Sequence, residues 1–398
     1  MIKKPHQEEK VSVSMPKSCV IVCHDWTPGP PHRLRDFLIR QGCERLLFIG
    51  HRNRYITDNP VKSSYFEVWE NGRLARRVSF PVYQLPELFQ YIADSILTIY
   101  WTIRLGFGKS DYFFGAGNLN TVVGILLRFI KCTRFVIYYV IDFADMRFGS
   151  NWVRRIYREL DRFAARFADT TWNFSGSMIA YRMQIWGKTF VHQQVVPHGS
   201  DPSGKLLPSN QIRRRDLVYL GIIRQEQGLD IVIESMPGLI RQYPDCQLHI
   251  IGAGPYQNQL VSKVKRLRLK YAIRLYGYVK DENKIIRKLA RSGIGVAMYS
   301  QDHSYSSRTD SGKIKSYLSA GLPVITTVSA GTERVENQAK FIYRCGNDIG
   351  EFTRTVQNIF RMSDTDYRSL RRRILAWAGK NTWDGIFRQA FEDFPDRQ

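Results

Sequence analysis

Short apolar stretches alternate with amphipathic ones through the second half of the chain. Buried strands are predicted at residues 217–220, 247–251, 273–279 and 293–298. After the first of these, apolar side chains recur at roughly helical spacing, at Ile231, Ile233, Met236, Leu239 and Ile240. The alternation continues without a break from Asp216 to about Thr326. It predicts a parallel sheet covered by helices.

The first half of the chain has a similar pattern. Residues 18–23 are a continuous apolar run, and a helix is predicted at residues 32–41. Further strands are predicted at residues 46–49, 111–114 and 134–140. The pair Asn71-Gly72 between two strand-like segments predicts a hairpin turn. Because a chain of 398 residues is long for one core, we expect two domains.

The segment from Asp310 to Ile325 combines a polar loop, a short helix, a glycine stop and a strand that begins at Pro323. Free N–H groups at the start of a helix, together with the nearby Lys313, form a site for an anion such as a diphosphate. An ordinary helix-to-strand connection would have the same kinds of residue. The segment alone therefore leaves both interpretations open.

Three blocks of sequence then occur in a distinctive order. They are Gly228-Leu-Asp, Leu-His-Ile-Ile-Gly-Ala-Gly-Pro at 248–255, and Lys-Ile-Lys-Ser-Tyr-Leu-Ser-Ala-Gly-Leu-Pro-Val-Ile at 313–325. With these blocks the chain resembles the group 1 family of retaining glycosyltransferases, over most of Asp216 to Thr382 and more weakly in the N-terminal half. The resemblance implies an α/β chain with the GT-B fold, in which two Rossmann-like, doubly wound domains face an interdomain cleft.

The resemblance and the breaks in the pattern together predict the domain boundaries. Residues 195–201 resemble the family's exit into an interdomain linker, and Pro202, Gly204 and Pro208 break any regular element after it. We expect a disordered tail at 1–17, an acceptor-side N-terminal domain at 18–201, a linker at 202–215, a nucleotide-sugar-binding C-terminal domain at 216–375, and a C-terminal helix at 376–398 that returns to the N-terminal domain.

The resemblance also implies a donor site for a nucleotide sugar, UDP- or GDP-linked, that needs no metal and no cofactor. Lys313 and Arg224 are the predicted catalytic cations that neutralise the diphosphate. Asp142, at the carboxyl end of a central strand, is predicted to orient the acceptor hydroxyl or to take its proton. The other predicted donor-binding residues are Gly221, Gly252, Gly254, Asp310, Ser311, Gly312, Ser316 and Glu333.

The sequence departs from the family pattern at several of these positions. Ile222 stands where the family's arginine directly follows the glycine, and Gln227 stands where a lysine precedes Gly228. The acids of the family's Glu-x7-Glu pair would fall on Arg308 and Ser316, so both are absent. Two alternatives therefore stay open: a non-catalytic GT-B subunit that supports a partner transferase, and a sugar-nucleotide epimerase of the same fold.

On the acceptor side, Gly29 and His32 are the predicted residues. Gly29 lies in the first strand-to-helix loop, where it would let a ligand approach the backbone, although most such glycines serve only the turn. His24, His32 and His198 are alternatives to Asp142 as proton acceptors. A lone histidine is more often structural, so all three are weaker candidates for that role.

The charge of the chain favours anionic partners, because 59 lysines and arginines against 36 acids give a net charge of +23. Residues 151–168 carry one apolar and one basic stripe, and residues 88–107 are rich in aromatics but interrupted by Asp94 and Arg104. Neither is a clean membrane span, and both fit shallow contact with an anionic membrane surface or an ordinary place in the protein. No module that reads nucleic acid occurs, so nucleic acid is not an expected partner.

The six cysteines lie mostly in apolar contexts without a Cys-x-x-Cys pair, which predicts buried free thiols in a reducing compartment. We expect a cytoplasmic protein associated peripherally with the inner face of the membrane. The predicted function is a retaining, metal-independent hexosyltransferase. It would move a hexose from a nucleotide sugar to a lipid-linked or cell-surface polysaccharide acceptor.

Overall fold

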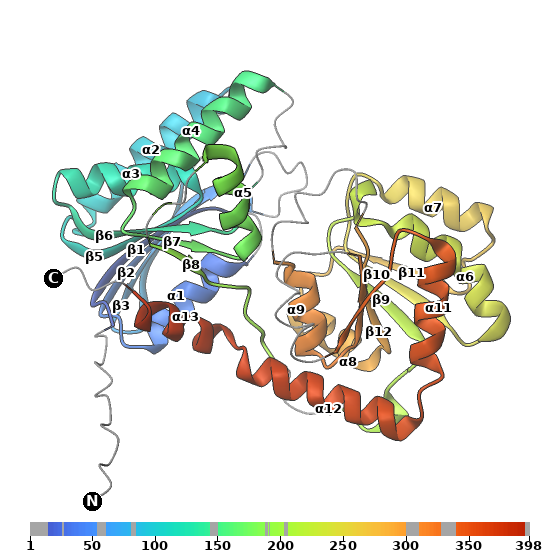
Figure 1. Cartoon of the computed structure of the whole chain (residues 1–398). Coiled ribbons are helices and arrows are strands. Elements are labelled where there is room, and N and C mark those ends of the chain that lie inside the picture. The colour runs from blue at the N-terminus through green and yellow to red at the C-terminus, as the bar shows by residue number, and fades with distance from the viewer. Residues whose placement is uncertain are drawn as a thin grey trace, which may run out of the picture.

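Two mainly parallel β-sheets, each with helices on both faces, make up the chain (Figure 1). The computed structural model describes residues 15–25, 28–53, 61–80, 85–143, 150–187, 190, 192–202, 206–299, 310–327 and 340–394. Most of the tail predicted at 1–17 lies outside these residues. The two sheets confirm the predicted fold class.

The N-terminal sheet has eight strands in the order β4-β3-β2-β1-β5-β6-β7-β8. Its strands are β1 (Ser18–Asp25), β2 (Arg45–Arg52), β3 (Ser64–Glu70), β4 (Arg73–Phe80), β5 (Ser110–Ala116), β6 (Thr133–Val140), β7 (Thr170–Asn173) and β8 (Gln193–Val195). β1 pairs in parallel with both β2 and β5, so the sheet is wound in both directions from its centre. The antiparallel β3–β4 hairpin turns at Asn71 and Gly72, both with positive φ, as predicted.

Helices cover both faces of this sheet. They are α1 (Pro30–Arg40), α2 (Glu87–Arg104), α3 (Asn118–Phe129), α4 (Asn151–Phe167) and α5 (Gly176–Trp186). α2, α3 and α4 lie side by side on one face, over a core that includes Phe113, Val123 and Val136 (Figure 1). On the opposite face, Phe37 of α1 packs into a second core with Trp172.

The C-terminal sheet has six strands in the order β11-β10-β9-β12-β13-β14. They are β9 (Asp216–Leu220), β10 (Gln247–Ile251), β11 (Ile273–Gly277), β12 (Ile294–Ala297), β13 (Val324–Thr326) and β14 (Ile342–Arg344), all paired in parallel. One face is covered by α6 (Leu229–Gln242), α7 (Gln257–Arg266) and α11 (Ile349–Phe360), and the other by α8 (Glu282–Arg291), α9 (Gly312–Ser319) and α12 (Asp364–Lys380).

The chain returns to the N-terminal domain at its C-terminal end. α12 runs straight through residue 375, where the domain boundary was predicted, and ends at Lys380. The hydroxyl of Thr382 then accepts a hydrogen bond from the backbone of Gly385 and so begins α13 (Trp383–Glu392). α13 packs against α1 (Figure 1), and Phe391 is buried in the N-terminal core.

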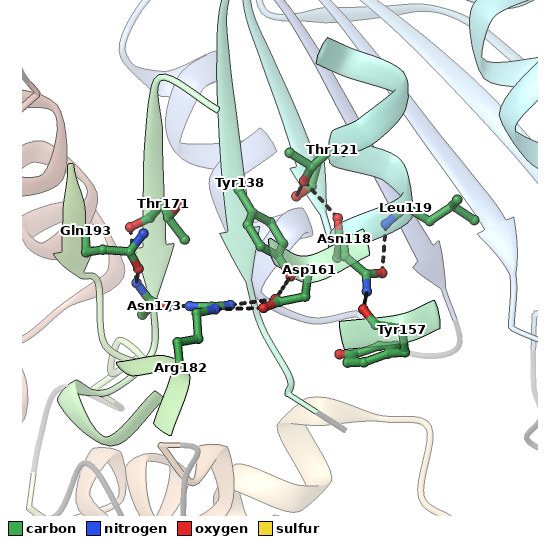
Figure 2. Close-up of polar contacts among 12 residues, drawn as sticks. Asn118, Leu119, Thr121, Tyr138, Tyr157, Asp161, Thr171, Asn173, Arg182 and Gln193 are labelled. Atoms are coloured by element: carbon green, nitrogen blue, oxygen red, sulfur yellow. Dashed lines mark hydrogen bonds and ion pairs between the residues drawn. The ribbon is translucent and has the colours of Figure 1, made fainter. Parts of the chain in front are cut away.

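A buried ion pair connects α4 and α5 to strands β6 and β7 of the N-terminal sheet (Figure 2). Arg182 of α5 donates hydrogen bonds to both carboxylate oxygens of Asp161 of α4, at 2.8 and 2.9 Å, and Tyr138 of β6 donates to the same carboxylate at 2.5 Å. Arg182 also contacts the side-chain oxygen of Asn173 in β7. Because these charges are paired and hydrogen-bonded, the inner side of α4 is held firmly against the sheet.

Candidate functional site

A cleft of about 2510 Å³ lies between the domains, and both sheets turn their carboxyl edges toward it. It is lined from the N-terminal side by residues such as Asp25 and Asp142, and from the C-terminal side by residues such as Gly221 and Lys313. The carboxyl edge of a parallel sheet is where open α/β folds bind ligands. The cleft therefore brings most of the predicted site residues to one place.

Lys313, in the first turn of α9, reaches across to the loop after β9. Its Nζ donates a hydrogen bond to the side-chain oxygen of Gln227, lies 3.3 Å from the hydroxyl of Tyr219, and sits 4.5 Å from the centre of the Tyr219 ring. Burial lowers the pKa of Lys313 to about 7. The described hydrogen-bond partners of Lys313 are thus neutral groups. Its positive charge is therefore available to attract an anionic ligand.

Two glycine turns pack against each other beside this lysine. Gly221 and Gly252 have φ values of 144° and 138°, and a Cβ on Gly252 would lie 1.9 Å from the carbonyl oxygen of Gly221. A Cβ on Gly254 would lie 2.3 Å from the carbonyl oxygen of Ile223. The close approach of the two loops therefore requires glycine at positions 252 and 254, and the positive φ favours glycine at 221, whether or not a ligand binds there.

Asp310 ties the start of α9 to the segment that links the domains. Its Oδ2 accepts a hydrogen bond from the backbone N–H of His198 at 2.9 Å and lies 3.2 Å from Nζ of Lys315. Asp310 is buried, its Oδ1 has no hydrogen-bond partner among the described residues, and burial raises its pKa. The sequence predicted a donor-binding role for Asp310. The geometry adds a structural role, because Asp310 connects the start of α9 to the segment that links the domains.

The neighbours of Asp310 on α9 also line the cleft. The hydroxyl of Ser311 lies 2.6 Å from that of Tyr299, and the hydroxyl of Ser316 donates back to the carbonyl of Gly312 at 3.1 Å. A Cβ on Gly312 would lie 2.7 Å from Nε2 of His198, so the histidine ring packs directly on this glycine. Arg224, just before a 3-10 turn at residues 225–227, is half-buried and lines the same cleft.

On the acceptor side, the predicted pair Gly29 and His32 is joined to two residues that sequence patterns did not suggest. The backbone N–H of Gly29 donates to Nδ1 of His32 at 3.2 Å, so the proton of the neutral ring lies on Nε2. That Nε2 lies 3.3 Å from the hydroxyl of Tyr65 and 3.4 Å from Oδ2 of Asp25. Tyr65 donates to the same Asp25 oxygen at 2.7 Å.

A second histidine cluster lies deeper under the same edge. The carboxylate of Asp94 in α2 lies 3.5 Å from Nε2 of His24 and 3.4 Å from Nδ1 of His51. His51 is fully buried, and burial lowers its pKa. Nδ1 of His24 lies 3.3 Å from the side-chain amide of Asn120, so its Nε2 is free to donate toward Asp94. Sequence spacing gave no signal for this cluster, because its members come from separate strands and helices.

The remaining predicted residues divide into two groups. Asp142 lies just beyond β6, is exposed, and lines the cleft. His198 is half-buried between the rings of Phe174 and Trp383, and the partial burial lowers its pKa to about 4. Glu333 and Arg308 lie outside the described residues. Within those residues, no group of three or more acidic, histidine or cysteine side chains could hold a metal ion.

The sequence of the C-terminal domain matches a known family. Residues 214–361 fit the model described as Glycosyl transferases group 1. The C-terminal domain belongs to the group 1 glycosyltransferases. The chain is also 25% identical over 153 residues to a glycogen synthase of Mycobacterium tuberculosis, and this match covers 37% of each protein. The matched part is therefore little more than a third of that relative's length.

Solved structures extend the likeness in fold to both domains of the chain. Anabaena HepE in complex with UDP and glucose has a TM-score of 0.68 at 15% identity, covering 94% of this chain and 97% of its own. Sucrose-phosphate synthase from Thermosynechococcus elongatus has a TM-score of 0.68 at 14% identity, covering 94% and 96%. At such identities the likeness shows the fold alone, and that fold is GT-B.

Proposed function

We propose that the protein transfers a hexose from a nucleotide sugar to an acceptor hydroxyl, with retention of configuration at the anomeric carbon and without a metal. In this reaction the bond from the anomeric carbon to the diphosphate oxygen breaks, and a bond to the acceptor oxygen forms on the same face. The acceptor proton leaves with the diphosphate or passes to a nearby base. The three sequence blocks shared with retaining transferases support this outcome.

The observation that carries the proposal is the position of Lys313. Its amine lies in the cleft at the first turn of α9, beside the glycine turn at Gly221, with an amide and a phenol as its described hydrogen-bond partners. Backbone N–H groups at a helix start and a nearby cation together favour a diphosphate. Arg224, which lines the same cleft, would add a second positive charge.

UDP is the nucleotide that we propose first, with GDP as the alternative. HepE, which shares the fold, has been solved with UDP and with UDP-glucose. We infer that the acceptor is a lipid-linked or cell-surface glycan that enters from the N-terminal side, past Gly29 and His32. Asp142 would orient the attacking hydroxyl there or receive its proton.

Isothermal titration of the purified chain with UDP, GDP, ADP and their hexose conjugates tests the donor assignment. We expect UDP and one UDP-hexose to bind, and we expect Lys313→Ala to weaken both by about tenfold or more, because a charge-assisted contact to phosphate is lost. Lys265→Ala, an exposed lysine on α7, is the matched control and should leave binding unchanged. Nucleotide binding that is equal in both variants would remove Lys313 from the donor site.

A non-catalytic GT-B subunit is the second candidate, and the contact of Ser316 favours it. Ser316 stands where the family has an acid, and its hydroxyl donates to the backbone of Gly312. A neutral hydroxyl so engaged is a weaker partner for a ribose than a carboxylate. The absence of binding for every nucleotide and conjugate would support this candidate, whereas product formation from a UDP-hexose would exclude it. Product anomeric configuration, read by proton NMR, tests retention.

A further inference from the structure

Large apolar side chains are concentrated on the outer side of α2. Phe89, Ile92, Ile96, Tyr100 and Ile103 all have about half or more of their surface exposed. They recur every three or four residues, so they form one stripe along the whole helix. Most surface helices place such a stripe against the core, but here it faces outward.

The two helices beside α2 extend this apolar surface. Leu126, Phe129 and the following Ile130 are exposed at the end of α3, and Trp152 and Ile156 are exposed at the start of α4. Phe129 and Trp152 are 65% and 62% exposed. α2, α3 and α4 lie side by side (Figure 1), and their exposed apolar side chains are together called the outer helical face below.

The inner sides of these helices are already occupied. Asp94, Thr98 and Thr102 of α2 are buried toward the sheet, and Asp161 of α4 is fixed by Arg182 and Tyr138 (Figure 2). A rotation that buried the outer helical face would expose these polar groups and break their hydrogen bonds. The apolar face is therefore available to something outside the domain.

Basic side chains surround the outer helical face. Arg104 at the end of α2, Lys131 after α3, and Arg155 and Arg166 of α4 are all exposed. The exposed acid on the described part of α4 is Glu159, and it lies 3.7 Å from Arg162. An apolar stripe with aromatic side chains and a basic border matches the chemistry of a bilayer surface that contains anionic lipids.

The face is also continuous with the cleft. Ile92, Ile96, Trp152 and Ile156 are exposed on the outer helical face and at the same time line the interdomain cleft. No helix of the described residues is long and apolar enough to cross a membrane. Contact through this face would place the mouth of the cleft at the level of the lipid headgroups.

We propose that the outer helical face is a docking surface for an anionic lipid bilayer, with the axes of α2, α3 and α4 lying along the membrane plane. This inference concerns a surface outside the donor site and does not depend on the proposed transfer reaction. It gives the apolar side chains an environment that water does not offer, and it gives the basic border a negative partner.

Sedimentation of the purified full chain with large unilamellar vesicles tests this surface. We expect binding to vesicles of equimolar phosphatidylcholine and phosphatidylglycerol, weaker binding to pure phosphatidylcholine, and a decrease with added salt. The double substitution Ile103→Glu with Phe129→Glu should weaken binding at least about tenfold, because two charges replace inserted apolar side chains. Both residues lie away from the cleft lining, so UDP titration of the same variant reports on the donor site separately.

Tyr271→Glu is the matched control, because Tyr271 is as exposed as Phe129 but lies in the C-terminal domain. It should bind vesicles like the unchanged chain, and all variants should keep the same melting temperature. The proposal would be overturned if Tyr271→Glu lost as much vesicle binding as the double variant. It would also be overturned if the unchanged chain bound neither kind of vesicle. A stable dimer that only the double variant dissociates, without vesicle binding, would assign the face to a second copy of the chain.

Discussion

Nζ of Lys313 donates a hydrogen bond to the side-chain oxygen of Gln227, across the space between α9 and the loop after β9. Gln227 occupies the position where the group 1 glycosyltransferases have a lysine. Lys313 therefore contacts a neutral side chain in place of a second cation. Burial lowers the pKa of Lys313 to about 7. The amine can therefore change its charge near neutral pH when an anion enters or leaves the cleft.

Lys313→Met should stabilise the protein while it removes donor binding. The folded chain holds this lysine with a pKa of about 7, whereas an unfolded lysine titrates near 10.4. Between about pH 7 and 10.4 the unfolded chain binds a proton at Lys313 that the folded chain does not hold. Lys313 therefore lowers the free energy of unfolding at pH 7. This effect fades as the pH rises toward 10. We expect a gain on the order of 1–3 kcal/mol for Lys313→Met at pH 7, measured by urea unfolding.

The pH dependence of that gain is the check on its cause. The advantage of Lys313→Met over the unchanged chain should shrink as the pH rises from 7 toward 10, because the unfolded lysine then loses its proton as well. An advantage that stays constant over this range would mean that methionine merely packs better in the cleft. Lys265→Met, at an exposed position, should be neutral at every pH.

Binding of UDP should become weaker as the pH rises through about 7. The diphosphate favours the charged form of Lys313, so binding above this pH must draw a proton from solution. Titration calorimetry at pH 8 in two buffers of different ionisation enthalpy should reveal this proton uptake. Lys313→Ala should bind UDP weakly and without proton uptake. If that variant took up the same number of protons, the titrating group would be another residue.

The sequence was informative where the fold depends on local spacing. The strand–helix alternation and the Asn71-Gly72 turn predicted elements that the structure contains. Lys313 stood out because it directly follows a run of small residues at a helix start. The glycines at 252 and 254 were equally visible in the sequence. The reason for them was not, since it lies in the contact between two turns that are distant in the sequence.

The histidine clusters could not be predicted in the same way. Asp25, His32 and Tyr65 meet because β3 lies two strands from β1 and α1 follows β1, and no spacing along the chain encodes that meeting. The same holds for His24 and Asp94, which come from β1 and α2. A buried carboxylate with histidine partners has to be found from the fold, because single histidines and acids are common in every sequence.

Asp310→Asn should destabilise the protein by weakening the link between α9 and the interdomain segment at His198. Asparagine can still accept the hydrogen bond from the backbone of His198, but it leaves the buried Lys315 without its counter-charge. Loss of one partner of a buried ion pair costs about 3–5 kcal/mol. Asp364→Asn is the control, because this acid pairs with Arg214 at a position where its own side chain is 81% exposed. It should cost less than about 1 kcal/mol in urea unfolding.

If Asp310→Asn and Asp364→Asn were equally mild, Lys315 would have to be stabilised by something other than Asp310. The ring of Trp377, 5.4 Å from the Lys315 amine, is the described alternative. The double variant Asp310→Asn with Lys315→Met separates the two explanations. It should recover much of the lost stability if the unpaired buried charge is the cause, since a buried pair can be replaced by an apolar side chain at little cost.

His32 should position the acceptor-side loop without contributing to donor affinity. Its Nδ1 receives the N–H of Gly29, and its Nε2 faces Asp25 and Tyr65, so the ring joins the first loop to the sheet. His32→Phe removes both contacts, and a displaced loop can cost up to about a hundredfold in turnover. We expect kcat/KM for the acceptor to fall while the affinity for UDP stays the same. Tyr65→Phe, which keeps the contact with Gly29, should have a smaller effect, and a parallel loss of UDP affinity in His32→Phe would instead place this histidine on the donor side of the cleft.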